Sequence, residues 1–303
     1  MHERRLDGGA RVFDDHRDNL TVDVQSELLL ERAAEMRSEH SEAAMLWNVF
    51  RTLQRLDAGV WLPRLLRRAL PEAEGLGVLE PLLSRPNVAG TTFHWWRRYD
   101  LPESRHSWLR EAAQNACLRL EHYVPRCLAE KKAEAERRLT ADLPLEDPVE
   151  MPLCVETPAW MLGVAAVYKS NLRRHALFDS GRDEVLRFLD AGTWAAGAGN
   201  KRFLCLVVHT DTRTLNVETL RLVDRYRGRP ERLIEALPHR HDAAALRQAA
   251  ACLGTLAWRD LGALLVQVKD EERLGIFDVA ALDELIKYLG RKDIGFNFFR
   301  RLK

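Results

Sequence analysis

The sequence predicts an α/β protein in which a small mixed sheet is flanked by helices. Three short apolar runs bounded by turn residues have the length and composition of buried strands. They are PVEMPLCVET, WMLGVAAVYKS and RFLCLVVHT. The segments before and after these runs place apolar residues at helical spacing. The expected order is therefore helices, a strand hairpin, a helix, a strand and further helices, with helical N- and C-terminal extensions.

The N-terminal half is predicted to be helical after a polar start. Residues 1–25 are polar with mixed charge and are expected to form a flexible arm. Ser41 followed by Glu42 is typical of a helix start, and apolar residues recur at helical spacing after it. Residues 60–100 are interrupted by four prolines, which favours short helices and loops. We therefore assign residues 26–140 to a helical region that includes the first core helix.

Residues 141–212 are predicted to form the sheet. The first two apolar runs are joined by a Thr-Pro turn as a hairpin, and a helix beginning near Arg182 precedes the third strand. Residues 213–303 are expected to be mostly helical again. Asp242 and Asp278 are candidate N-caps for two of these helices, the first running through AAALRQAAACLGTLAW.

Composition restricts the class of protein. The chain of 303 residues is 46% hydrophobic and 30% charged, which is typical of a soluble globular protein, and its formal net charge is only +1. A nucleic-acid site would therefore need local clustering of arginines. The five cysteines never occur as CxxC, which favours reduced thiols over disulfides or zinc. Without an apolar signal segment or a run of about eighteen apolar residues, we expect a cytoplasmic protein with no membrane contact.

Four stretches resemble, in order, the core motifs of the PD-(D/E)XK, or restriction-endonuclease-like, nuclease superfamily: SEAAMLWNVFRTL, EMPLCVET, VAAVYKS and RDEVLRFLDAG. The resemblance covers roughly residues 41–210 and implies a restriction-endonuclease-like core. In that family an Asp on one strand and a Glu on the next hold Mg²⁺, which activates water against a phosphodiester. A Lys two residues after the Glu shares its strand face and stabilises developing charge.

The resemblance places the catalytic Asp at Pro152, the Glu at Ala165 and the Lys at Val167. None of these residues offers an oxygen ligand or a charge. The resemblance therefore implies a pseudo-nuclease with no intact catalytic residue, no metal and no other cofactor. The alternative is an active Mg²⁺-dependent DNA nuclease with a displaced site. Glu42, in the family's first-helix acidic position, would then act with Glu156 and Lys169, which share strand parity with the lost residues.

Basic residues near the second strand are candidates for nucleic-acid contact. Such side chains would bind phosphates and contribute affinity without sequence information. A solvated charged edge is the alternative interpretation. The candidates are Lys169, Arg173, Arg174, Arg182 and Arg187.

Three further motifs have alternative interpretations. HWWRRYD (94–100) can stack bases or pack in the core. LPHRHD places His239 and His241 two apart, as in a metal pair, although a loop before a helix is the simpler interpretation. GFNFFRRLK (295–303) is expected to dock on a partner subunit or to close the protein's own core.

These features lead to three functional hypotheses. The first, which includes analogy with the family, is an inactive nuclease-like protein that binds DNA or RNA, or scaffolds a multi-subunit bacterial phage-defence or mobile-element complex. The second is the displaced-site nuclease. The third is a module that binds only proteins, because a fold does not by itself determine function.

Overall fold

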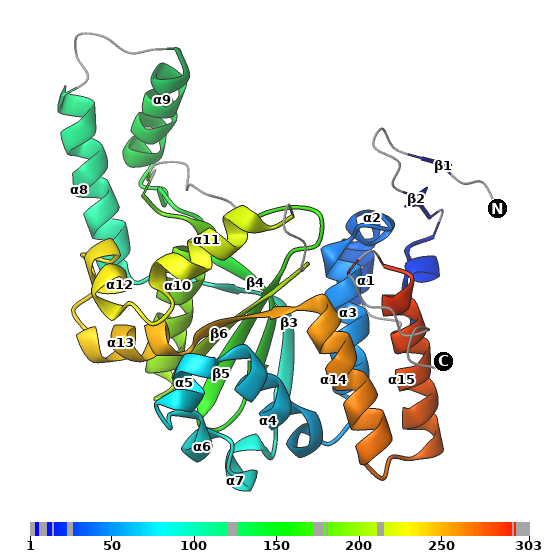
Figure 1. The fold of residues 1–303 in the computed structure, drawn as a ribbon. Helices are drawn as coiled ribbons and strands as arrows, with labels where there is room; N and C mark the ends of the chain where they lie inside the picture. Colours follow the sequence, from blue (N-terminus) through cyan, green and yellow to red (C-terminus); the bar gives the residue numbers. More distant parts are fainter. Residues whose placement is uncertain are drawn as a thin grey trace.

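The computed structural model describes residues 27–119, 126–172, 181–210 and 215–292, together with residues 4–5, 11–13, 15–22, 179 and 294. At its centre is a five-stranded sheet in the order β3-β4-β5-β6-β7 (Figure 1). The first three strands are antiparallel neighbours, and the last three are parallel. The strands are β3 (Thr92–Tyr99), β4 (Val149–Glu156), β5 (Trp160–Ala166), β6 (Arg202–His209) and β7 (Leu253–Ala257). The mixed sheet flanked by helices that the sequence predicts is therefore present.

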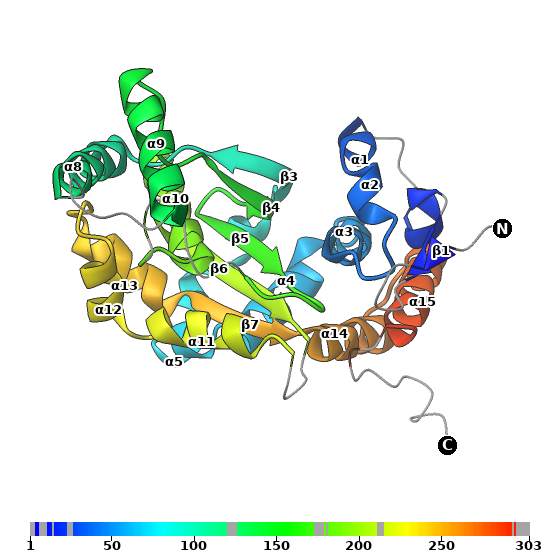
Figure 2. The same ribbon diagram turned by 90° about the horizontal axis from the view of Figure 1, so that it is seen from above.

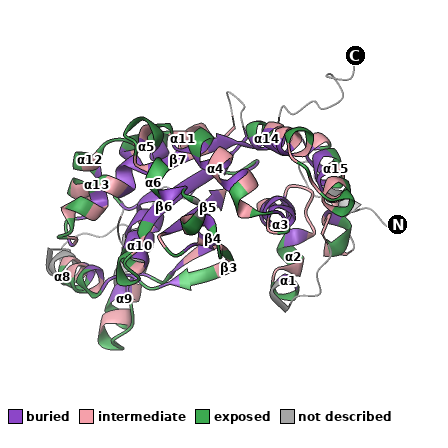
Figure 3. Ribbon diagram, turned by 90° about the horizontal axis from the view of Figure 1, so that it is seen from below, coloured by how far each residue is buried: buried purple, intermediate pink, exposed green. Residues whose placement is uncertain are grey.

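Helices cover both faces of the sheet, and a buried apolar core lies on each face (Figures 2 and 3). One face carries α3 (Glu42–Leu53), α4 (Ala58–Ala69), α14 (Trp258–Glu271) and α15 (Ile276–Gly290). The opposite face carries α10 (Glu184–Ala198), α11 (Val217–Tyr226), α12 (Pro230–Ala236) and α13 (Ala243–Ala251). The short helices α5 (Pro71–Gly75), α6 (Leu79–Leu82) and α7 (Arg85–Val88) follow α4. None of the described helices is long and apolar enough to cross a membrane.

Glycines allow two helices to approach the sheet closely. A Cβ atom added to Gly192 of α10 would lie 2.1 Å from the ring of Phe203 on β6. A Cβ atom on Gly254 of β7 would lie 1.8 Å from the carbonyl oxygen of Ala69, the last residue of α4. The end of α4 therefore packs directly on the backbone of β7.

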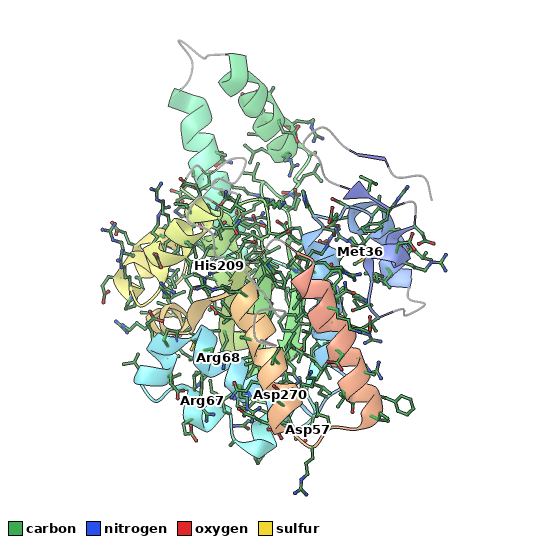
Figure 4. The ribbon with its side chains drawn as sticks, turned by 45° about the vertical axis from the view of Figure 1, so that its right-hand side comes forward. Met36, Asp57, Arg67, Arg68, His209 and Asp270 are labelled. Carbon is green, nitrogen blue, oxygen red and sulfur yellow. The ribbon has the colours of Figure 1, made fainter. Side chains whose placement is uncertain are left out.

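Polar contacts are made near both ends of α4, where Figure 4 labels Asp57 and Arg68. The side chain of Asp57 accepts a hydrogen bond from the Gly59 N–H at 2.9 Å, which caps the start of the helix. Near the end of α4, Arg68 donates to Gln267 of α14 at 2.6 Å.

Two helical projections extend beyond the sheet (Figures 1 and 2). The helices α8 (Glu103–Arg119) and α9 (Arg126–Thr140) form one of them, with a small apolar cluster of their own. The other consists of α1 (Glu27–Glu31) and α2 (Ala33–Met36), next to the short elements β1 (Arg4–Arg5), β2 (Arg11–Val12) and η1 (His16–Asn19). Within the predicted arm, buried Asn19 donates hydrogen bonds to the carbonyl oxygens of Met36 and Ser38.

Several local predictions were wrong. The strand β3 lies where loops and short helices were expected, and β7 interrupts the helix predicted after Asp242, although Asp242 does cap α13 by accepting the Ala245 N–H at 3.0 Å. The residue that caps α15 is Gly275, and Asp278 lies inside the first turn. Tertiary packing explains β7, because five residues pair with β6 under α4 and override a helix-favouring context.

Candidate functional site

A cleft opens where two neighbouring strands diverge. The pairing of β4 with β5 ends at Leu153↔Val164, whereas β4 continues beside β3 as far as Val149↔Tyr99. The helices α3 and α10 reach this opening from opposite faces of the sheet and enclose a cleft of about 850 Å³. Its lining includes Glu42, Pro152, Ala165 and Val167.

Pro152 lies at the point of divergence. On the β3 side the ladder pairs Trp95 with Leu153 and Arg97 with Met151, and it omits the intervening pair of Trp96 and Pro152. Proline has no N–H to donate, and Trp96 has φ = +48°, which is rare for a bulky residue. Residues two apart on a regular strand share a face, yet Leu153 packs in the core on the α3 face and Met151 in the core on the α10 face. The strand therefore changes face at Pro152.

Beyond Val164, the edge of β5 faces the cleft. The Val167 N–H donates to the Val208 carbonyl of β6 at 2.8 Å. Because successive residues of a strand direct their N–H and C=O groups to opposite edges, those of Ala166 point toward the cleft, whereas the Tyr168 carbonyl accepts the Thr210 hydroxyl at 2.8 Å. The side chains of Ala165 and Val167 are buried in the core on the α10 face.

Glu42 closes part of this strand edge. Its Oε1 atom accepts the Tyr168 N–H and the Ser170 hydroxyl, each at 2.7 Å. Burial raises the pKa of Glu42 above its usual value, and the hydrogen bonds from Ser170 and Tyr168 oppose that rise. Glu42 therefore replaces the hydrogen bond that a neighbouring strand would otherwise supply.

The structure does not bring the three residues of the displaced site together. Glu156 pairs with Met161 in the first half of β5, and its carboxylate binds Lys201 Nζ at 2.5 Å and His94 Nε2 at 3.0 Å. These contacts, chiefly the hydrogen bond from Lys201, lower the pKa of Glu156. Lys169 follows the opposite end of β5, is exposed, and lies over the Tyr168 ring at 5.5 Å. Only Glu42 and Lys169 are near the same end of the strand.

The predicted nucleic-acid residues do not share one exposed surface. Arg182 is 1% exposed and belongs to a buried ion-pair network. Arg187 is partly exposed and donates to Glu146 Oε1 at 2.8 Å. Arg173 and Arg174 lie outside the described residues. Lys169 is therefore the exposed cation among the candidates that the structure describes.

The buried network escaped the sequence analysis. Arg182 donates to Glu146 and Asp190, each at 2.8 Å, and His239 Nε2 lies 2.8 Å from the same Asp190 carboxylate. Burial alone would raise the pKa of Asp190, but the hydrogen bond with His239 and the nearby arginine charges hold it below its usual value. His239 is thus part of an ion-pair network, and it is not paired with His241 around a metal. No local signal in the sequence links residues so far apart.

Residues 94–99 of the HWWRRYD motif lie on β3, where the two tryptophans pack against α3 while Arg97 and Arg98 are exposed. The Trp96 ring stacks on Trp47 of α3 with centroids 5.6 Å apart, and Trp95 lies 4.7 Å from Trp47. The Arg32 guanidinium lies 5.7 Å from the Trp96 centroid. This arrangement agrees with the core-packing interpretation.

The rim of the cleft is acidic. Among the described residues, five carboxylates and three guanidinium groups line it, which gives these residues a formal charge of −2 when all are ionised. Two of the arginines, Arg32 and Arg98, already pair with Glu150. The charged residues are Glu35, Glu42, Asp147, Glu150, Glu184, Arg32, Arg98 and Arg187.

The chemistry of the cleft must be interpreted from its own residues. Comparison with protein-family models, with curated proteins and with solved structures finds no match for this chain. Within the part of the chain that the structure describes, no group of three or more His, Cys, Asp or Glu side chains is placed to hold a metal ion. The carboxylates of this lining can attract cationic groups.

Proposed function

We propose that this chain is a nuclease-like protein that does not hydrolyse phosphodiesters and instead serves as a scaffold in a bacterial defence or mobile-element complex. The observation that carries the proposal is the convergence of four residues on one cleft. Pro152, Ala165 and Val167 occupy the catalytic positions that the family resemblance assigns, and all three line the cleft with Glu42. Glu42 lies on α3, Pro152 on β4 and Ala165 on β5, and Val167 directly follows β5.

The chemistry of these side chains supports the loss of cleavage. Magnesium requires hard oxygen ligands, and the side chains at positions 152, 165 and 167 supply none. Glu42 accepts two hydrogen bonds from the chain that follows β5. Glu150, the acidic residue next to these positions on β4, pairs with Arg32 and Arg98. The carboxylates near the floor thus already have partners within the protein.

The charge of the cleft supports a protein partner over a phosphate backbone. A lining with a formal charge of −2 repels nucleic acid, whereas it attracts basic segments of a protein. The excess of carboxylates in the described lining therefore suits a basic surface of a partner protein.

Nucleic-acid binding is a second candidate, and one observation favours it. Exposed Lys169 lies close enough to His40 and Lys292 for its charge to lower the pKa of both groups, although burial is the larger cause in each case. Lys169, at the end of β5, is the exposed cation of this group and can contact phosphate beside the cleft.

Two measurements test these candidates. Plasmid and oligonucleotide DNA incubated with the chain and Mg²⁺ or Mn²⁺ should remain intact, and metal-dependent cleavage would overturn the proposal. Gel retardation across a salt series then separates scaffold from nucleic-acid binder. Binding that weakens steeply with salt, with a slope reduced by about one in Lys169→Ala, would favour the second candidate. The matched control is Lys287→Ala, which removes a 59% exposed lysine of α15.

A further inference from the structure

A small cavity lies where the end of α15 meets the N-terminal elements (Figures 1 and 2). Its volume is about 130 Å³, and its lining includes Asp18 and Asn19 of η1, Tyr288 of α15, and Arg291 and Lys292 just after α15. A water molecule takes up about 30 Å³ in the liquid, so the cavity has room for a molecule of only a few heavy atoms. The GFNFFRRLK segment that follows lies outside the described residues.

Lys292 brings a buried amine to this cavity. The residue is 8% exposed, and its Nζ donates to the carbonyl oxygen of Glu39 at 2.6 Å and to Asn19 Oδ1 at 3.4 Å. Both acceptors are uncharged, whereas the partly buried Lys201 and Lys269 each pair with a carboxylate. Two N–H groups satisfy these acceptors, so a neutral amine can keep both hydrogen bonds and still offer its lone pair.

The neighbours of this amine act on its charge in opposite directions. Burial, the largest effect, and the charges of Arg291 and Lys169 disfavour the ammonium form, while the Glu39 carboxylate favours it. The Tyr288 ring, with its centroid 4.6 Å from Nζ, also favours the cation. The balance lowers the pKa of Lys292 to about 8. About one amine in ten is then neutral at pH 7, against roughly one in three thousand for an ordinary lysine.

The charges of the lining indicate what can enter. Asp18 and Glu39 contribute two carboxylates, and Arg291 and Lys292 two cations, so the described lining has no formal net charge when all four are ionised. This balance suits a small uncharged molecule better than an anion or a cation. Among such molecules an aldehyde can use the lone pair of the amine, because its carbonyl carbon is an electrophile.

We propose that Lys292 forms a Schiff base with a small uncharged aldehyde that enters this cavity. The Nζ lone pair adds to the carbonyl carbon, and the carbonyl oxygen then leaves as water. Counted from the ammonium form, two of the three hydrogens on Nζ leave in that water, and the iminium product keeps the third. The product therefore retains the positive charge that the Tyr288 ring favours and an N–H that can donate to the Glu39 carbonyl oxygen. The cavity is separate from the cleft between α3 and α10, so this inference does not rest on the proposed function.

Reductive labelling of the full chain measures this reaction. The chain is incubated at pH 7 with limiting propanal and sodium cyanoborohydride, which reduces an imine to a stable propyl-lysine, and peptide mass spectrometry gives the labelling rate at each lysine. We expect Lys292 to react at least about ten times faster than Lys287, which is 59% exposed, because a larger share of its amine is neutral. Equal or slower labelling of Lys292 would overturn the proposal.

The dependence on pH distinguishes the buried amine from an ordinary one. Labelling of Lys292 should level off above about pH 8. Labelling of Lys287, whose pKa is raised by its hydrogen bond with Glu284, should keep rising beyond about pH 10. Parallel pH profiles for the two lysines would contradict the inference.

The size of the cavity supplies another test. Naphthaldehyde is too bulky for the cavity and should label Lys287 without labelling Lys292. In Lys292→Arg, which keeps the positive charge, the rapidly labelled site should disappear while the rate at Lys287 stays the same. If naphthaldehyde labelled Lys292 as fast as propanal does, the amine would be reacting outside the cavity and the proposal would fail.

Discussion

Replacing Arg182 with alanine tests whether this predicted nucleic-acid residue is instead part of the protein's structural framework. The Arg182 side chain is 1% exposed, and its guanidinium donates to Glu146 and Asp190 at 2.8 Å each. The substitution leaves a fully buried Asp190 with two remaining partners, His239 and Arg240, and it also opens a cavity. Removing one member of a buried ion pair costs about 3–5 kcal/mol. Because Asp190 keeps other partners, we expect a loss of about 3 kcal/mol in the free energy of unfolding.

Urea denaturation followed by circular dichroism measures this loss. A decrease of about 3 kcal/mol is large beside the roughly 5–15 kcal/mol that stabilises a typical domain. The matched control is Arg98→Ala, because Arg98 is 74% exposed and lies 3.5 Å from Glu150. Exposed pairs of this kind contribute about 0–1 kcal/mol, so the control should change little. A loss below about 1 kcal/mol in Arg182→Ala, or weakened DNA retention at unchanged stability, would refute the structural assignment.

Three further predictions concern single residues. Glu42→Gln keeps an acceptor for the strand edge and removes a buried charge. Burial raises the folded-state pKa of Glu42 above the unfolded value of 4.5, so the stability of the wild-type chain falls as pH rises between these two values. The melting temperature of Glu42→Gln should not show this fall. Gly254→Ala should lower the free energy of unfolding, measured by urea denaturation, by about 1–3 kcal/mol, because its Cβ would lie 1.8 Å from the Ala69 carbonyl oxygen. The control Gly197→Ala, whose Cβ would have nothing within 4 Å, should stabilise α10 slightly. Burial lowers the pKa of Lys292 from 10.5 to about 8, so the stability of the wild-type chain should rise as pH increases from 8 to 10.5. Any stability advantage of Lys292→Met over the wild type at pH 7 should therefore shrink as pH approaches 10.5. A difference in stability that stays constant with pH would contradict this.

The sequence predicted the centre of the sheet because its strands are simple. The strands β4, β5 and β6 are short apolar runs that are buried on both faces, so composition alone marks them. The edge strand β3 lacks this signal, because three of its residues are exposed and the left-handed backbone at Trp96 disrupts its side-chain alternation. The five residues of β7 lie directly between two helices and carry no boundary of their own.

The candidate site could be predicted only in part. The resemblance placed Pro152, Ala165 and Val167 at one site, and all three line one cleft. The charge of the cleft could not be predicted, because Arg32, between α1 and α2, and Glu35, on α2, reach it only through tertiary packing. The same limit explains the assignment of Arg182 to nucleic acid, since its partner Glu146 is 36 residues away in the sequence.

A cleavage assay with a titration of divalent metal measures the central claim most directly. Supercoiled plasmid and labelled single- and double-stranded oligonucleotides are incubated with purified chain in rising Mg²⁺ or Mn²⁺, beside a Glu42→Ala preparation that reveals contaminating nuclease. We expect no product that depends on this chain at any metal concentration. Cleavage that rises with metal and disappears in the Glu42→Ala preparation would contradict the account.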